Sequence, residues 1–198
     1  MTVVQPVPRS TAEARRAVVL SKAISAFART GYYATPVADV AQAAKISPAY
    51  VFRLFDGKLA LFVAALDECF DRVLTALAEG ADSLPGAEPD QMLEAMGDAY
   101  AELIADRDLL MLQVHALSAS DVPEIRAGLQ DGLARVVAYV TECTGASTEA
   151  VQRFMAYGQL CHLIVAADLV GSTPAWAATL TTGMAHPAPA DPLPGDRH

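Results

Sequence analysis

The sequence predicts an all-α protein of about nine helices. Three observations lead to this fold class. Apolar residues recur every three or four positions along most of the chain, which is the spacing of a buried helix face. Serine, threonine or proline stands where several of these patterns begin, as is common at helix starts. No segment of useful length alternates apolar and polar residues with the period of two that a half-buried strand requires, so no sheet is expected.

The first helix is expected over residues 11–29. Ser10 and, three residues later, Glu13 form a capping box that would begin it, and Gly31 would end it. Residues 1–9 hold two prolines and no periodic pattern, so we expect a flexible arm there. The apolar face of the helix would comprise Leu20, Ala23, Ile24 and Phe27.

Two short helices follow, over residues 37–44 and 48–54. A Thr-Pro pair at 35–36 and a Ser-Pro pair at 47–48 are the start signals, since a hydroxyl can cap a helix and proline at its first position loses no needed N–H. With the first helix, this pair predicts a helix-turn-helix. The residues facing the first helix and the turn would be Val40, Ala41, Ala44, Ile46, Val51 and Leu54.

The rest of the chain predicts a body of long helices. Asp56-Gly57 breaks the chain before a helix over 58–81, and a loop with Pro and Gly covers 83–89. Further helices are expected over 90–105, 107–119, 123–143, 148–170 and 174–182. We therefore divide the chain into an N-terminal arm and helix-turn-helix head (1–58), an antiparallel helical body (59–183) and a disordered Pro-rich tail (184–198).

Charge is distributed unevenly between the head and the body. The chain carries a net charge of −9. Residues 1–58 hold eight Lys and Arg against three Asp and Glu, which gives +5, whereas the remainder holds six against twenty, which gives −14. Such a distribution indicates that the head meets a polyanion and the body does not. Chance clustering of the bases is the alternative.

Several function classes have little support. There is no Ser/His/Asp or Cys/His constellation, no glycine-rich phosphate loop and no HExxH, so we do not expect an enzyme. Cys69, Cys143 and Cys161 form no CxxC pair, which predicts reduced structural thiols, no metal and no cofactor. Neither a signal peptide nor a run of about 20 apolar residues is present, so we expect a cytoplasmic protein without a membrane span.

The head resembles the DNA-binding domain of the tetracycline-repressor (TetR) family. The resemblance rests on the runs GYYATPVADVA at residues 31–41, AKIS at 44–47 and FRLFDGKLALF at 52–62, and it extends without gaps over about residues 15–62. Three positions depart from the family pattern: Lys45 stands where glycine is usual, Phe52 replaces a tyrosine that contacts phosphate, and Leu54 replaces a common histidine. Base preference therefore cannot be transferred from relatives.

The resemblance and the exposed face of the third helix together indicate a set of DNA-binding residues. Arg53 and Tyr50 are the expected readers of base edges in the major groove. Thr35 and Ser47 would cap their helices and contact phosphate, with plain capping as the alternative. Lys58 would neutralise a phosphate. The full set is Thr35, Pro36, Lys45, Ser47, Pro48, Ala49, Tyr50, Arg53 and Lys58.

The resemblance also implies a homodimer that binds a palindrome and an unidentified small-molecule inducer. Dimer contacts are expected from Phe154, Gly158, Leu160, Leu163, Ile164, Ala167, Trp176 and Leu180, with plain core packing as the alternative. An apolar or aromatic ligand would contact Met92, Met96, Tyr100, Leu103, Met111, His115, Tyr139, Phe154, Met155 and Tyr157, since methionine and aromatic side chains make adaptable pockets. The same stripe also suits an ordinary core.

The function that these expectations describe is a transcriptional repressor released from operator DNA by its ligand. An activator of the same geometry is one alternative. The other is an architectural DNA-binding protein without a ligand, although such proteins are usually basic throughout and this body is acidic.

Overall fold

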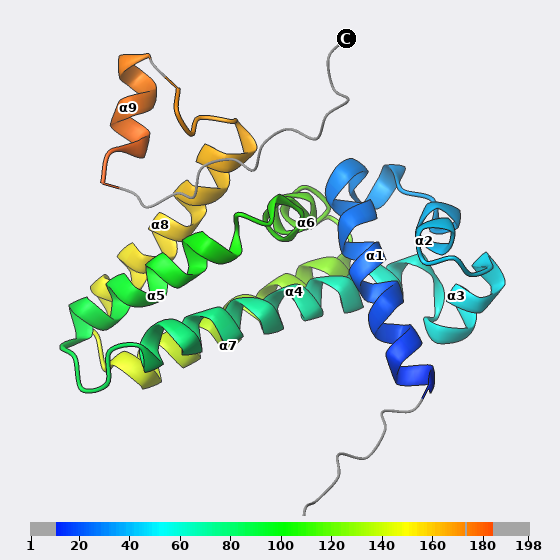
Figure 1. Ribbon diagram of the computed structural model, residues 1–198, viewed down its shortest axis with the longest axis horizontal. Coiled ribbons are helices and arrows are strands. Elements are labelled where there is room, and N and C mark those ends of the chain that lie inside the picture. Colours follow the sequence, from blue (N-terminus) through cyan, green and yellow to red (C-terminus); the bar gives the residue numbers. More distant parts are fainter. Residues whose placement is uncertain (1–10, 173, 184–198) are drawn as a thin grey trace, which may run out of the picture.

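The computed structural model describes residues 11–172 and 174–183, and within them every regular element is a helix (Figure 1). The all-α prediction is therefore confirmed for this part of the chain. In order, the helices are α1 (Thr11–Ala34), α2 (Val37–Ala43), α3 (Pro48–Leu54), α4 (Gly57–Asp82), α5 (Pro89–Leu103), α6 (Arg107–Ser118), α7 (Pro123–Thr144), α8 (Thr148–Ala166) and α9 (Ala175–Thr181).

The observed helix bounds follow the start and stop signals closely, with one clear exception. Gly31 has φ 74° and interrupts α1 where its end was predicted, although one more turn continues to Ala34. The predicted helix 148–170 is too long, because Asp168 adopts φ 54° and the regular helix ends at Ala166. A left-handed residue cannot continue a right-handed helix. The predicted arm and tail lie outside the described residues.

Helix α4 is the central element, and it joins the head to the far end of the body (Figure 1). It packs against α1 at the head and against α5 and α7 along the body. In the head, the Phe27 and Phe62 rings meet edge to face with centroids 4.9 Å apart. One continuous apolar core runs from Val19 in α1 to Val151 in α8, so head and body share buried surface.

Two glycines allow α4 and its neighbours to approach closely. A Cβ added at Gly80 would lie 2.7 Å from the backbone oxygen of Ala95 in α5. A Cβ at Gly132 of α7 would lie 2.1 Å from the Phe70 ring of α4. Since neither site has room for a methyl group, these contacts set the spacing of the three helices.

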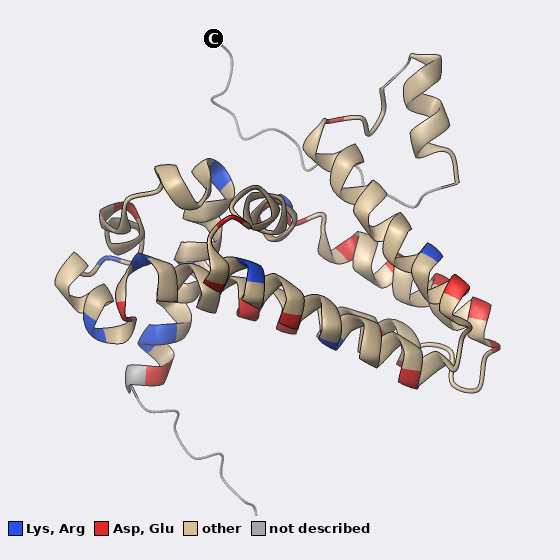
Figure 2. Ribbon diagram, turned by 180° about the vertical axis from the view of Figure 1, so that it is seen from behind, with Lys and Arg blue, Asp and Glu red and all other residues tan. Residues whose placement is uncertain are grey.

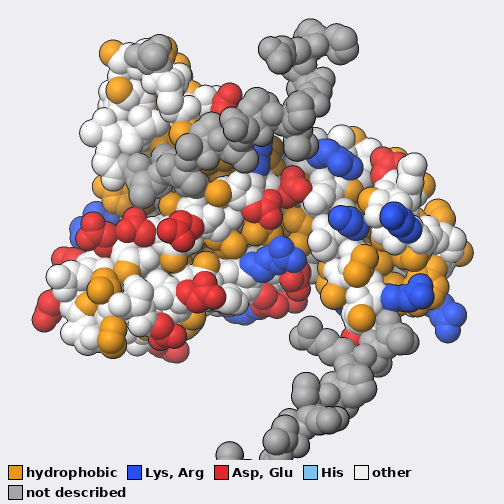
Figure 3. All heavy atoms as spheres, in the orientation of Figure 1, with side chains coloured by type: hydrophobic (Ala, Val, Ile, Leu, Met, Phe, Trp, Pro, Cys, Tyr) orange, Lys and Arg blue, Asp and Glu red, His pale blue; other side chains and the backbone are white. Residues whose placement is uncertain are grey.

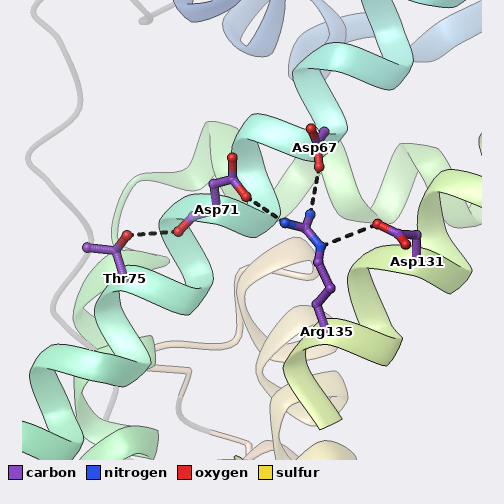
Figure 4. Close-up of polar contacts among 5 residues, drawn as sticks. All are labelled: Asp67, Asp71, Thr75, Asp131 and Arg135. Atoms are coloured by element: carbon purple, nitrogen blue, oxygen red, sulfur yellow. Dashed lines mark hydrogen bonds and ion pairs between the residues drawn. The ribbon is translucent and has the colours of Figure 1, made fainter. Parts of the chain in front are cut away.

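Charged side chains join α4 to α7 on the surface (Figure 4). The Arg135 guanidinium donates to Asp71 at 2.6 Å and to Asp67 at 2.7 Å on α4, and it lies 3.3 Å from Asp131 on its own helix. Because one guanidinium serves three carboxylates in a fork geometry, this network fixes the register of the two helices better than an isolated surface pair would.

Helix α6 is the second connection between body and head. His115 Nε2 lies 3.1 Å from the Ala28 carbonyl oxygen of α1, and the ring packs over Gly31. Tyr33 Oη donates to Asp121, beyond the end of α6, at 2.6 Å. These contacts join α6 and the segment after it to the last turns of α1.

Candidate nucleic-acid interface and ligand cavity

The turn between α2 and α3 is built from backbone hydrogen bonds. Ile46 N donates to Ala41 O and Lys45 N donates to Gln42 O, both at 3.0 Å, which is the Schellman pattern of a helix end. Lys45 takes the left-handed position of this motif with φ 55°, where glycine would be unstrained. Its side chain is exposed.

Helix α3 is capped as predicted and presents a polar face to solvent. Ser47 Oγ accepts a hydrogen bond from Tyr50 N at 3.2 Å, and Pro48 occupies the first turn. Val51 is 1% exposed and holds the helix against the head core. The outer face, with Arg53 in the last turn, is open to solvent. A helix presented in this way can enter the major groove of DNA.

Two arginines of α1 stack on aromatic rings of the head, and sequence reasoning missed both. The Arg15 guanidinium carbon lies 5.9 Å from the centroid of the Tyr50 ring, and that of Arg16 lies 4.4 Å from the centroid of Phe55. These stacks add positive charge beside α3. Figures 2 and 3 show Lys and Arg gathered on the head and Asp and Glu on the body.

Thr35 does not lie as predicted, whereas Lys58 lies in the first turn of α4 as expected and its phosphate contact stays a prediction. Thr35 is 1% exposed, and its hydroxyl donates to Gly31 O at 2.6 Å. The cap position of α2 is Pro36, without a side-chain hydrogen bond, so the predicted capping role of Thr35 is wrong. Lys58 Nζ donates to Tyr33 O at 3.1 Å, and burial lowers the pKa of this lysine. Both side chains tie the end of α1 to neighbouring elements.

A cavity of about 510 Å³ lies in the body, within the size range of small-molecule sites. Side chains from α4, α5, α6, α7 and α8 line it. Its wall is mostly apolar and includes the rings of Phe70, Tyr100, Phe154 and Tyr157. Gln113 of α6 supplies a buried amide, and its Nε2 donates to the Leu109 carbonyl at 3.4 Å.

Part of the predicted ligand set lines this cavity. Tyr100, Phe154, Met155 and Tyr157 do so. Six others lie away from it: Met92, Met96, Leu103, Met111, His115 and Tyr139. These belong to the packed core or its edge, apart from His115, which contacts the head. Lining residues that were not predicted include Gln113, Arg153 and the acids Asp90, Glu94 and Asp98.

A buried histidine stands behind the cavity. His162 is 5% exposed, and its Nε2 lies 2.6 Å from the Tyr100 hydroxyl. Burial lowers the pKa of His162 to about 4, so the ring is neutral at pH 7. His162 is therefore a histidine of the core, hydrogen-bonded through one ring nitrogen. Its Nδ1 has no hydrogen-bond partner among the described residues.

The predicted dimer residues divide into three groups. Phe154 and Gly158 line the cavity, and Ile164 is fully buried within the chain. Leu163 of α8 and Trp176 of α9 are 51% and 60% exposed. The remaining residues, Leu160, Ala167 and Leu180, are partly or fully exposed. Among the predicted dimer residues, Leu163 and Trp176 are therefore the large side chains left mostly exposed.

The cysteines are free thiols. Burial raises the pKa of Cys69 to about 12 and that of Cys161 to about 11, so both remain protonated and unreactive at neutral pH. Over residues 11–172 and 174–183, no group of three His, Cys, Asp or Glu side chains is placed to hold a metal ion. In the same residues, no helix is both long and apolar enough to cross a membrane.

Residues 19–65 match the family model of bacterial regulatory proteins of the tetR family. No curated protein matches the sequence significantly. The matched segment runs from the buried face of α1 through α3 into the first turns of α4.

Solved structures with the same fold cover nearly the whole chain. A TetR-like transcriptional regulator from Rhodococcus sp. RHA1 is 20% identical, with a TM-score of 0.62 over 88% of this chain and 94% of its own. The fatty acid degradation regulator FadR from Bacillus halodurans is 15% identical, with a TM-score of 0.67 over 93% and 100% of the two chains.

A second FadR, from Bacillus subtilis, was solved in complex with stearoyl-CoA. It is 15% identical to this chain, with a TM-score of 0.66 over 85% of this chain and 99% of its own. The resemblance to the tetR family is thus confirmed: residues 19–65 carry the family's head, and the described chain has the fold of TetR-like transcriptional regulators.

Proposed function

We propose that this protein is a sequence-specific, DNA-binding transcriptional repressor that leaves a palindromic operator when a small ligand fills its body. The observation that carries the proposal is α3, a capped helix whose outer face is exposed beside exposed bases of the head. Such a helix is the recognition element of helix-turn-helix proteins, which insert it into the major groove.

We propose that Arg53 recognises a base edge, and its position in α3 gives this assignment the most support. It lies in the last turn of α3, exposed and without an ion-pair partner among the described residues. Arginine can donate two hydrogen bonds to guanine. Lys45 and Ser47 flank the same surface and would contact phosphate. Thr35 is left out of this surface because its hydroxyl is buried in the head.

A dimer would supply the two heads that a palindrome requires. Tyr157 and Leu163 on α8 and Trp176 on α9 are each more than half exposed. Large apolar side chains exposed to solvent can mark a protein–protein interface. Two copies joined through α8 and α9 would cover them and place the α3 helices to meet successive grooves, about 34–36 Å apart.

Two helices connect the cavity to the head. Phe70, Val73 and Leu77 of α4 line the cavity, and the same helix begins three residues after α3 ends. On α6, Gln113 lines the cavity and His115 contacts the end of α1. A ligand that binds better to one arrangement of α4 and α6 shifts the separation of the heads, and its differential affinity sets the size of the effect.

An activator would use the same DNA contacts, and only a promoter assay separates the two. An architectural protein would bind DNA without sequence preference. The body's charge of −14 is evidence against an architectural protein, because the acidic surface of the body would repel DNA.

Binding-site selection on random duplex DNA tests the proposal. Wild type should recover a palindrome. Arg53→Ala should weaken binding by about 1–3 kcal/mol and relax preference at one base pair of each half-site. Arg126→Ala is the control, since it removes the same charge from the body. Recovery of no sequence by wild type, or equal effects of the two variants, would contradict the proposal.

A further inference from the structure

One face of α5 places three carboxylates along the cavity. Asp90, Glu94 and Asp98 are spaced by four residues, so they lie on the same side of the helix over about 12 Å, and all three line the cavity. Each is exposed, and none has an ion pair or hydrogen bond with a described side chain. Figure 3 shows acidic side chains along the part of the body where Figure 1 places α5.

Few positive charges in the cavity lining balance these three carboxylates. Arg153 of α8 is the one Lys or Arg among the described lining residues. Hydrogen bonds from the backbone and Ser147 lower the pKa of Glu149, one helical turn earlier, and the charge of Arg153 adds a smaller effect. The lining thus carries three carboxylates against one guanidinium. An anion entering here would meet net repulsion.

The aromatic lining is suited to the same kind of ligand. Phe70, Tyr100, Phe154 and Tyr157 present rings to the cavity. The face of an aromatic ring attracts a cation, and rings together with carboxylates are the chemistry that recognises alkylammonium groups. The apolar wall between them would bury a hydrocarbon or ring system.

We propose that the cavity takes an amphipathic cation, with an apolar body and an amine or quaternary ammonium group directed to the α5 carboxylates. This inference rests on the proposed ligand-binding role of the cavity and defines the class of ligand. It argues against anionic ligands such as fatty acyl thioesters of coenzyme A, because the charged side chains of the lining are net negative. The stearoyl-CoA bound to FadR of Bacillus subtilis is therefore a poor guide to this chain.

Three probes with apolar chains of nearly equal length test the class of ligand on the full-length protein. The head groups of decyltrimethylammonium, decan-1-ol and decanoate are cationic, neutral and anionic, and each probe is used below its micellar concentration in competition with the neutral dye N-phenyl-1-naphthylamine. Each exposed charge pair changes binding only a few-fold, so the cation should bind about tenfold more tightly than decanoate, and the alcohol in between. Raising the salt concentration should reduce the difference.

A charge-removing variant separates this inference from the proposed function. Glu94→Gln/Asp98→Asn should lose about fivefold in affinity for the cation and keep its affinity for decan-1-ol within about twofold. Glu102→Gln, on the same helix but outside the cavity lining, should change neither. Circular dichroism checks that the variants are folded.

The possible outcomes separate three claims: the cationic class of ligand, the role of the α5 carboxylates and the ligand-binding role of the cavity. Equal binding of all three probes, or tighter binding of decanoate, overturns the cationic class but leaves a ligand cavity. Selectivity that survives in the double variant overturns the role of the α5 carboxylates. Failure of all three probes and the dye to bind overturns the cavity's ligand-binding role together with this inference, while operator binding, measured separately, would still stand.

Discussion

The head and the body of this chain have opposite charges and opposite kinds of surface. The head is basic, and its candidate site is the convex face of one short helix. The body is acidic, and its candidate site is a cavity lined by side chains from five successive long helices. Substitutions on α3 therefore remove single contacts, whereas substitutions in the body act through helix packing and affect many contacts at once.

The largest expected effect is on the oligomeric state. Loss of the dimer through the body should also abolish DNA binding by the head. Leu163→Glu/Trp176→Glu places charges on the exposed apolar face of α8 and α9. We expect a monomer in sedimentation velocity, with operator binding lost because single heads bind weakly. Leu117→Glu is the matched control, since Leu117 is 47% exposed on α6 and should leave the dimer intact. A dimeric double variant would contradict the assignment of this face.

The packing of α4 against α5 gives the next largest effect. Gly80→Ala forces a methyl group against the α5 backbone at 2.7 Å, and overpacking of this kind costs about 1–3 kcal/mol of unfolding free energy. Gly128→Ala in α7 meets its nearest side-chain atom at 3.5 Å, so it should be neutral or gain up to about 1 kcal/mol from helix propensity. Urea denaturation measures both. Equal midpoints would mean that α4 and α5 can separate freely.

Buried His162 predicts a pH dependence that belongs to the body alone. Its pKa is lowered to about 4 in the folded state, so the unfolded state binds the proton first as pH falls below about 6.5. Stability should therefore decrease as pH falls from about 6.5 toward about 4, with a slope approaching about 1.4 kcal/mol per pH unit.

His162→Gln keeps a hydrogen-bonding partner for Tyr100 but cannot titrate. The variant should lack this component of the slope when urea denaturation is repeated at several pH values. Identical slopes for the two proteins would show that His162 is solvated or that its proton is retained on folding.

The smallest expected effect lies in the head. Lys45→Gly relieves the left-handed strain of the turn and should raise the free energy of unfolding by about 0.5–1 kcal/mol. Lys45→Ala removes the same charge but keeps the strain, so it should not be stabilised. If Lys45 contacts phosphate, both variants should lower the salt dependence of DNA binding by about one phosphate contact. An unchanged salt slope would make Lys45 a solvated turn residue.

The head was more predictable from sequence than the body because its signals are local. Ser47, Pro48 and Gly31 act on the backbone within a few residues of themselves, and each marks the expected boundary in the structure. Thr35 was misjudged for a tertiary reason. Its hydroxyl found a carbonyl of α1 in the head core, which no nearby pattern reveals.

The cavity could be predicted only in part, since its lining runs from Phe70 to Gly183. Aromatic and methionine content identified Tyr100 and Phe154, but the same criterion also selected Met96, which is fully buried in the core. Glu94 and Asp98 could not be selected by that criterion, because they are neither aromatic nor methionine. Their spacing indicated one side of a helix, but only the packing of α5 against α8 shows that this side borders the cavity.

Footprinting of wild-type protein on a selected duplex tests the central claim most directly. If two basic heads are held at a fixed distance by an acidic body, protection should appear as two discrete half-sites separated by about one helical turn of DNA or a multiple of it. Arg53→Ala should weaken the protection of both half-sites together. Uniform protection along unrelated DNA, or a single protected half-site, would contradict the account of a dimeric, sequence-specific regulator.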